Sequence, residues 1–71
     1  MIRTIKRIPA PNGGVQVVFN SAFMEYEVRF KAAPEARTSA YFTDDRLDAI
    51  GTAEEIAAQL TKTGTLTHKN D

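Results

Sequence analysis

The sequence MEYEVRFK, residues 24–31, alternates apolar and charged side chains without a break. Successive side chains of a β-strand point to opposite faces of the sheet, so this pattern predicts a strand with one buried face and one solvated face. The face expected to point into the core consists of Met24, Tyr26, Val28 and Phe30.

Three further segments have the pattern of short strands, residues 2–8, 15–20 and 38–42. In the first of them, alternation places Ile2 and Ile8 on one face and Ile5 on the other. The sequence PAPNGG (residues 9–14) separates the first two strands, because proline removes hydrogen-bond donors and Asn-Gly supplies the positive φ of a hairpin turn. Parallel strands need long crossovers, so short turns predict an antiparallel meander.

Residues 43–62 are predicted to form one long helix. Thr43 is a good N-cap, and Asp44 and Asp45 place negative charge in the first turn, where the helix dipole favours it. At about 100° per residue the small and apolar side chains gather on one side. This stripe consists of Ala49, Ile50, Ala53, Ile56, Ala57 and Leu60.

A glycine at position 51 could divide this helix. A break there would rotate Ala49 and Ile50 off the apolar stripe, so we expect one helix that ends near residues 61–63 with Gly64 at the C′ position. The predicted fold class is α+β, a three- to four-stranded antiparallel β-meander packed on one face by a single C-terminal α-helix. We expect residues 1–64 to form the domain and residues 65–71 a polar, flexible tail.

Composition excludes several kinds of site. The 71 residues contain no Cys and a single His, which removes disulfides, zinc fingers, iron–sulfur clusters and cysteine nucleophiles. The longest apolar run is Val17-Val18-Phe19, far short of the roughly 18 residues that a membrane span needs. The N-terminus lacks the apolar region of a secretory signal, so we expect a cytoplasmic protein.

Candidate catalytic residues have simpler structural explanations. Residues 44–48, DDRLD, match the magnesium-binding pattern of isoprenoid synthases, but helix-terminus electrostatics and solvation explain these aspartates. Glu25 and Glu27 share an open sheet face, where ion pairs with neighbouring basic residues are expected. His68 has no evident partner to orient it. We therefore predict no enzyme activity, no metal site and no cofactor.

The distribution of charge suggests a binding function. Nine basic residues balance nine acidic ones, but residues 1–37 carry a formal charge of +3 and residues 38–71 carry −3. A protein partner could dock on the acidic helix or on the open sheet. The candidate residues are Asp44, Asp45, Asp48, Glu55 and Gln59 on the helix and Glu25, Glu27 and Arg29 on the sheet.

Single-stranded nucleic acid is the alternative partner, because a basic sheet with an aromatic side chain can neutralise phosphates and stack bases. The residues for that function are Arg3, Arg7, Arg29, Lys31 and Tyr41. An unprotected edge strand leaves open whether the chain is a monomer or a weak homodimer. No membrane association is expected.

The stretch YFTDD (residues 41–45), followed by DAIGTA (residues 48–53), resembles a pattern in small uncharacterised proteins of bacteriophages. Such proteins end a β-meander with an aromatic pair, a Thr-Asp-Asp helix start and an Asp-Ala-x-x-Thr-Ala stretch. The resemblance implies a phage accessory protein that binds and redirects or inhibits a host protein in the bacterial cytoplasm. It assigns no functional residue.

Overall fold

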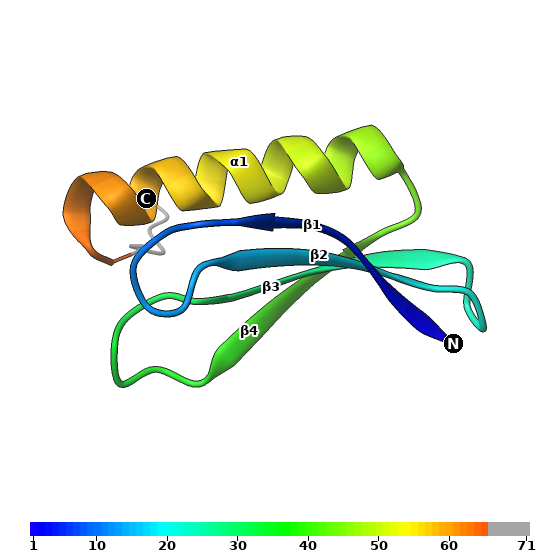
Figure 1. The fold of residues 1–71 in the computed structure, drawn as a ribbon, viewed down its shortest axis with the longest axis horizontal. Helices are drawn as coiled ribbons and strands as arrows, with labels where there is room; N and C mark the ends of the chain where they lie inside the picture. The colour runs from blue at the N-terminus through cyan, green and yellow to red at the C-terminus, as the bar shows by residue number, and fades with distance from the viewer. Residues whose placement is uncertain (66–71) are drawn as a thin grey trace, which may run out of the picture.

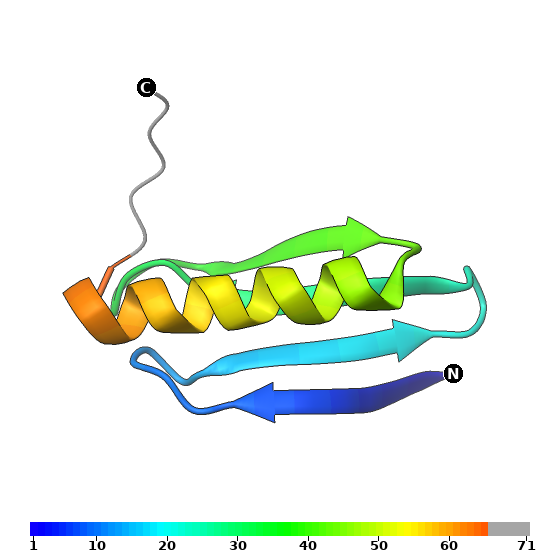
Figure 2. The same ribbon diagram turned by 90° about the horizontal axis from the view of Figure 1, so that it is seen from above.

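The computed structural model describes residues 1–65. The strands are β1 (Ile2–Ile8), β2 (Val15–Asn20), β3 (Glu25–Lys31) and β4 (Thr38–Thr43), and they are followed by the helix α1 (Arg46–Thr63). The four strands form one antiparallel sheet in the order β1-β2-β3-β4. The helix covers one face of this sheet and leaves the other face open (Figures 1 and 2). The predicted α+β class and the antiparallel meander are confirmed.

The turn between β1 and β2 forms at the predicted Asn-Gly pair. Asn12 has φ of 67° and Gly13 has φ of 95°. Gly14 follows with φ of 84°, and a Cβ atom there would stand 3.0 Å from the carbonyl oxygen of Ile8. The side-chain amide of Asn12 donates to the carbonyl oxygens of Lys31 (3.4 Å) and Gly64 (3.1 Å). Asn12 thus joins the turn to the end of β3 and to the end of α1.

A β-bulge in β1 overturns the predicted arrangement of its three isoleucines. Thr4 pairs with Val18 and Lys6 with Val17, so Ile5 is an extra residue between two consecutive pairs. The bulge shifts the alternation by one position. As a result Ile2, which pairs with Asn20, lies on the open face and is 51% exposed, whereas Ile5 and Ile8 both pack against the core.

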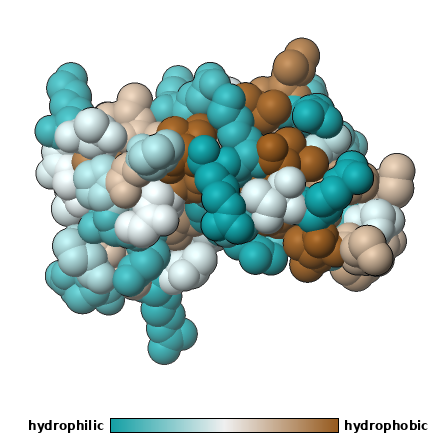
Figure 3. Space-filling model, viewed as in Figure 1, coloured by the Kyte–Doolittle hydropathy of each residue, from teal (hydrophilic) through white to brown (hydrophobic). Residues whose placement is uncertain are grey.

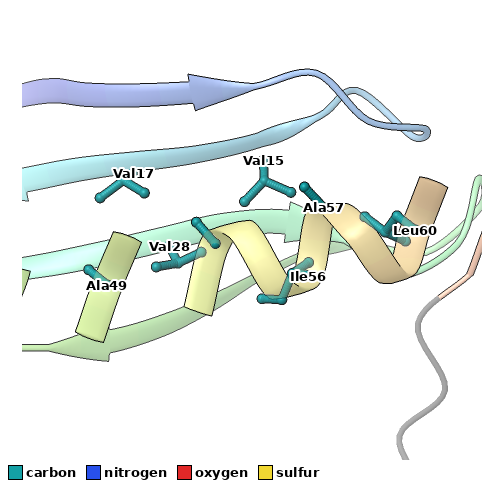
Figure 4. Packing of buried hydrophobic residues seen from close by; sticks show 8 residues of the cluster. Val15, Val17, Val28, Ala49, Ile56, Ala57 and Leu60 are labelled. Carbon is teal, nitrogen blue, oxygen red and sulfur yellow. The ribbon is translucent and has the colours of Figure 1, made fainter. Parts of the chain in front are cut away.

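The core lies between the helix and the inner face of the sheet (Figure 4). Val15 and Val17 of β2 and Val28 of β3 are at most 2% exposed and face the buried stripe of α1. The buried helix residues are Ala49, Ala53, Ile56, Ala57 and Leu60, as the periodicity predicted, while Ile50 is partly exposed. Alanines at the contact allow a helix to approach a sheet closely, since their side chains add little thickness.

The prediction that Met24 points into the core is wrong. Met24 has φ of 51°, lies in the turn before β3 and is 67% exposed, whereas Val28 is fully buried and Tyr26 and Phe30 pack against the core. The reason is the hairpin geometry. The loop between β2 and β3 closes with a residue in the left-handed region, and residue 24 takes that position instead of extending the strand.

One residue of the open face is also buried. Val18 is 1% exposed, although its neighbours across the strands, Thr4 and Glu27, place it on the face away from the helix. Glu27 is held beside it by an ion pair with Arg29, and Gln16 donates a hydrogen bond to Thr4. Longer polar side chains around Val18 therefore shield it from water.

The N-cap of the helix lies two residues later than predicted. Asp45, rather than Thr43, is the N-cap, and its carboxylate accepts from the N–H groups of Leu47 (2.9 Å) and Asp48 (3.3 Å). Thr43 instead completes β4 opposite Tyr26. The helix then runs without interruption through position 51, as expected.

The predicted C-terminal cap of α1 is confirmed. Gly64 is left-handed, with φ of 81°, and its N–H donates to the carbonyl oxygen of Leu60 at 2.6 Å. Of the predicted tail, residues 66–71 lie outside the described residues, and His68 is among them.

Candidate functional site

The residues on the helix side that were predicted to bind a partner are all exposed along α1 and its approach. They are Asp44, Asp45, Asp48, Glu55 and Gln59. Two of them also have local structural roles, because Asp45 caps the helix and Asp48 accepts a 2.7 Å hydrogen bond from the hydroxyl group of Tyr41. The three aspartates gather where the helix begins, whereas Glu55 and Gln59 lie farther along it.

The hydrogen bond between Tyr41 and Asp48 shifts the titration of both groups. It is the main reason that the pKa of Tyr41 is raised above its ordinary value of 10.0, and desolvation acts in the same direction. The same bond is the main cause of the lowered pKa of Asp48, to which a hydrogen bond with Thr43 adds. Asp48 is therefore held as a carboxylate, and Tyr41 as a neutral phenol, on the helix side of β4.

The sheet residues proposed for protein binding do share the open face. Glu25, Glu27 and Arg29 are alternate residues of β3. Arg29 donates to Glu27 at 3.1 Å, and the side chain of Glu27 is only 18% exposed. The pair thus covers part of the open face, and because its two charges neutralise each other, fewer unpaired charges face a partner than the sequence predicts.

The residues of the nucleic-acid alternative are divided between the two faces of the sheet. Arg7, Arg29 and Lys31 lie on the open face, because they pair with or alternate with residues that face away from α1. Arg3 pairs with Phe19, and Tyr41 pairs with Val28, so both side chains lie on the face that carries the helix. The structure does not bring the five together.

The basic part of the open face adjoins a shallow hollow of about 360 Å³. It lies beside the β1–β2 turn, and Arg29 and Lys31 contribute to its lining. Within residues 1–65, no three acidic or histidine side chains converge as metal ligands would. In the same part of the chain, no helix combines the length and the apolar character that crossing a membrane requires.

Five of the exposed large apolar side chains come from segments at one end of the molecule, which we call the apolar end, whereas Tyr41 and Phe42 belong to β4. Its members, with their exposed fractions, are Met1 (90%), Ile2 (51%), Phe23 (74%), Met24 (67%) and Leu47 (79%). They come from the start of β1, the turn between β2 and β3, and the first turn of α1. All three segments lie at this end (Figure 1). The space-filling view shows hydrophobic side chains at this end, and others nearer the middle of the molecule (Figure 3).

Hydrogen bonds fix part of the apolar end. The backbone N–H of Ser21 donates to the carbonyl oxygen of Met1 at 3.0 Å, which holds the N-terminus beside the β2–β3 turn. The turn itself is closed by the N–H of Phe23, which donates to Asn20 at 3.3 Å, and by the N–H of Ala22, which donates to the Asn20 side chain at 3.0 Å. Phe23 and Met24 are therefore displayed on an ordered hairpin tip.

Sequence reasoning did not identify the apolar end. Met24 continues the alternation of β3, so the pattern predicts that it belongs to the strand and to the core. A signal was present, since the turn lacks Gly and the residue before Glu25 had to supply its left-handed position. The acidic start of α1, with Asp44, Asp45 and Asp48 around a single Arg46, lies at this same end.

No protein-family model matches the chain, and neither a curated protein nor a solved structure matches it significantly.

Proposed function

We propose that the protein is a non-catalytic protein-binding module that docks through its apolar end. The observation that carries this proposal is the β2–β3 turn, where two adjacent large apolar side chains, Phe23 and Met24, are 74% and 67% exposed. Large apolar side chains that gather on a protein surface are typical of interaction sites. Phe and Met are also among the residue types enriched at protein interfaces.

The backbone of Met24 supports a binding role for this turn. A non-glycine residue in the left-handed region costs about 1–2 kcal/mol, and glycine adopts the same region freely. An exposed Met side chain returns little of that free energy through burial in the free protein. Burial of the Met24 side chain against a partner would offset this backbone strain, which gives a reason for a large apolar residue at this position.

The charges around the apolar end indicate the chemistry of the partner. Asp44, Asp45 and Asp48 place negative charge at the start of α1, where Arg46 is the one basic residue within the segment 44–48. A partner with an apolar surface bordered by Lys and Arg side chains would match this pattern and would associate faster through electrostatic steering. The resemblance to phage accessory proteins favours a host protein as that partner.

The proposal is tested by comparing the wild type with two variants in their ability to bind a protein from bacterial lysate. The double variant Phe23→Ser/Met24→Gly removes both apolar side chains and keeps a turn that the backbone accepts. Glu35→Ser, an exposed change in the β3–β4 loop, is the control. A protein captured from bacterial lysate by the wild type and the control would be purified and titrated by calorimetry.

We expect the double variant to bind that protein at least 30-fold more weakly, the loss typical of central interface residues worth about 2 kcal/mol. Circular dichroism would verify that the variant remains folded. Equal affinity of the double variant and the control would refute the apolar end as the binding surface.

A further inference from the structure

The two edges of the sheet differ sharply in their protection against pairing with another strand. β1, at one edge, carries Arg3, Lys6 and Arg7 and is interrupted by the bulge at Ile5. Charges and bulges are the features by which edge strands avoid further pairing. β4, at the other edge, has the sequence TSAYFT, with no charge and no proline, and its pairing with β3 is regular.

The outer side of β4 is accessible. The helix lies over the middle of the sheet and leaves this edge clear when the molecule is viewed from above (Figure 2). Phe42 on the open face is 55% exposed, and Tyr41 on the helix side is 39% exposed. Because an edge strand is paired on one side only, β4 retains backbone donors and acceptors that point outward.

The charges that flank β4 identify which strand fits it. Arg37 immediately precedes the strand, and Asp44 and Asp45 immediately follow it. In an antiparallel pair of two identical strands, the start of each lies beside the end of the other, so opposite charges meet at both ends. A parallel pair would bring like charges together, which is destabilising.

We propose that β4 pairs antiparallel with β4 of a second copy of this chain, about a two-fold axis perpendicular to the sheet. The two four-stranded sheets become continuous, and both helices lie on the same side. When Tyr41 stands opposite Tyr41 of the second copy, Phe42 stands opposite Ala40 and Arg37 opposite Asp45. A second register, in which Ala40 stands opposite Ala40, also keeps both helices on one side of the sheet. In that register Arg37 still lies next to Asp44.

This interface shares Asp44 and Asp45 with the proposed partner site but includes none of the five side chains of the apolar end, so the two proposals can be tested separately. Phe23 and Met24 lie in the β2–β3 turn, away from the outer side of β4. The variant Phe23→Ser/Met24→Gly should therefore dimerise like the wild type. Association that this variant abolishes would instead place the contact at the apolar end and overturn the proposal.

A charge-exchange experiment on the full chain tests the pairing. Sedimentation equilibrium over a range of concentrations would give the dimer dissociation constant of the wild type, Arg37→Glu, Asp44→Arg and an equimolar mixture of the two variants. Arg37→Glu adds a third carboxylate beside Asp44 and Asp45 at both ends of the interface, and Asp44→Arg brings a second guanidinium beside Arg37, so we expect each variant's dimer to weaken about tenfold. In the mixture opposite charges meet again, so a heterodimer of wild-type affinity should form.

A substitution within the strand provides a second measurement. Ala40→Lys would place two ammonium groups near the two-fold axis and should leave the chain monomeric, while Ala58→Lys, the same change at an exposed position of α1, should not. The proposal is overturned if the wild type is monomeric at millimolar concentration, if Ala40→Lys dimerises normally, or if the mixture forms no heterodimer.

Discussion

Tyr41 and Asp48 join β4 to the first turn of α1 through a single 2.7 Å hydrogen bond. Replacing Tyr41 by Phe removes the donor, so we expect the pKa of Asp48 to rise toward its ordinary value of 3.8, with the bond from Thr43 still lowering it. In Asp48→Asn, the pKa of Tyr41 should fall toward 10.0. Carbon-13 NMR titration of the two side chains would measure both shifts.

The same pair predicts how stability depends on pH. The pKa of Asp48 is lower in the folded state, so its contribution is present above pH 3.8 and is lost as pH falls through the folded value. The pKa of Tyr41 is higher in the folded state, so its contribution is present below pH 10.0 and is lost as pH rises through the folded value. Unfolding curves of Asp48→Asn should show a smaller loss of stability at acid pH than the wild type, and an unchanged acid limb would contradict the assignment.

Met24 permits a test of the strained turn. Glycine at this position relieves about 1–2 kcal/mol of left-handed strain but adds about 0.5–1 kcal/mol of unfolded-state entropy. We therefore expect Met24→Gly to raise the free energy of unfolding by about 0.5–1 kcal/mol in urea denaturation. Met24→Ala, which keeps the strain, should not stabilise, and a stabilised alanine variant would argue against strain.

At this scale, sequence reasoning failed where local geometry competes with a pattern. Period-two alternation assigns Met24 to a strand, but hairpin closure takes it into the turn. Strict alternation in β1 does not include the bulge at Ile5, which places the side chain of Ile2 on the open face of the sheet instead of the face that carries the helix. Alternation also gives no reason for Val18 to be buried, because that depends on the polar side chains of three strands.

At the scale of elements, periodicity succeeded because burial is collective. The alanine-rich stripe of α1 required an unbroken helix through Gly51, and the helix is unbroken. The N-cap was misplaced because Thr43 and Asp45 are both good caps, and only the pairing of Thr43 with Tyr26 decides between them.

The helix offers two matched glycine substitutions. A Cβ atom on Gly51 would meet nothing within 4 Å, so Gly51→Ala should stabilise the protein by about 1 kcal/mol. Gly64 is left-handed, and Gly64→Ala should instead destabilise it by about 1 kcal/mol. Thermal and urea unfolding would measure both effects, and a loss of stability in Gly51→Ala would contradict a continuous helix.

For the whole molecule, the core was largely predictable and the candidate site was not. Val28 and the helix stripe could be identified because burial imposes periodic patterns. The apolar end depends on which strand ends and turns the topology brings together, and the sequence places Met1, Phe23 and Leu47 far apart. The contrast between the β1 and β4 edges likewise required the strand order.

The small core makes the fold sensitive to a single truncation. Domains of this size rarely exceed about 3–5 kcal/mol of stability without disulfides or metals, and a buried Leu→Ala change costs about 2–5 kcal/mol. Leu60 is fully buried, so Leu60→Ala should remove most of the free energy of unfolding, as measured by urea denaturation followed by circular dichroism. Leu47, which is 79% exposed, provides the matched control. The free energy of unfolding of Leu47→Ala should lie within about 0.5 kcal/mol of that of the wild type.

The side chain of Asn12 bonds to a carbonyl group 52 residues away in the sequence, and to a second one 19 residues away. Both contacts are present together only when the first hairpin, the third strand and the last helical turn have all assembled. The NMR signals of this one carboxamide would consequently act as a reporter of complete assembly. Their rate of solvent exchange would give the frequency with which the terminal helix detaches from the hairpin, separately from fraying at either end of the chain.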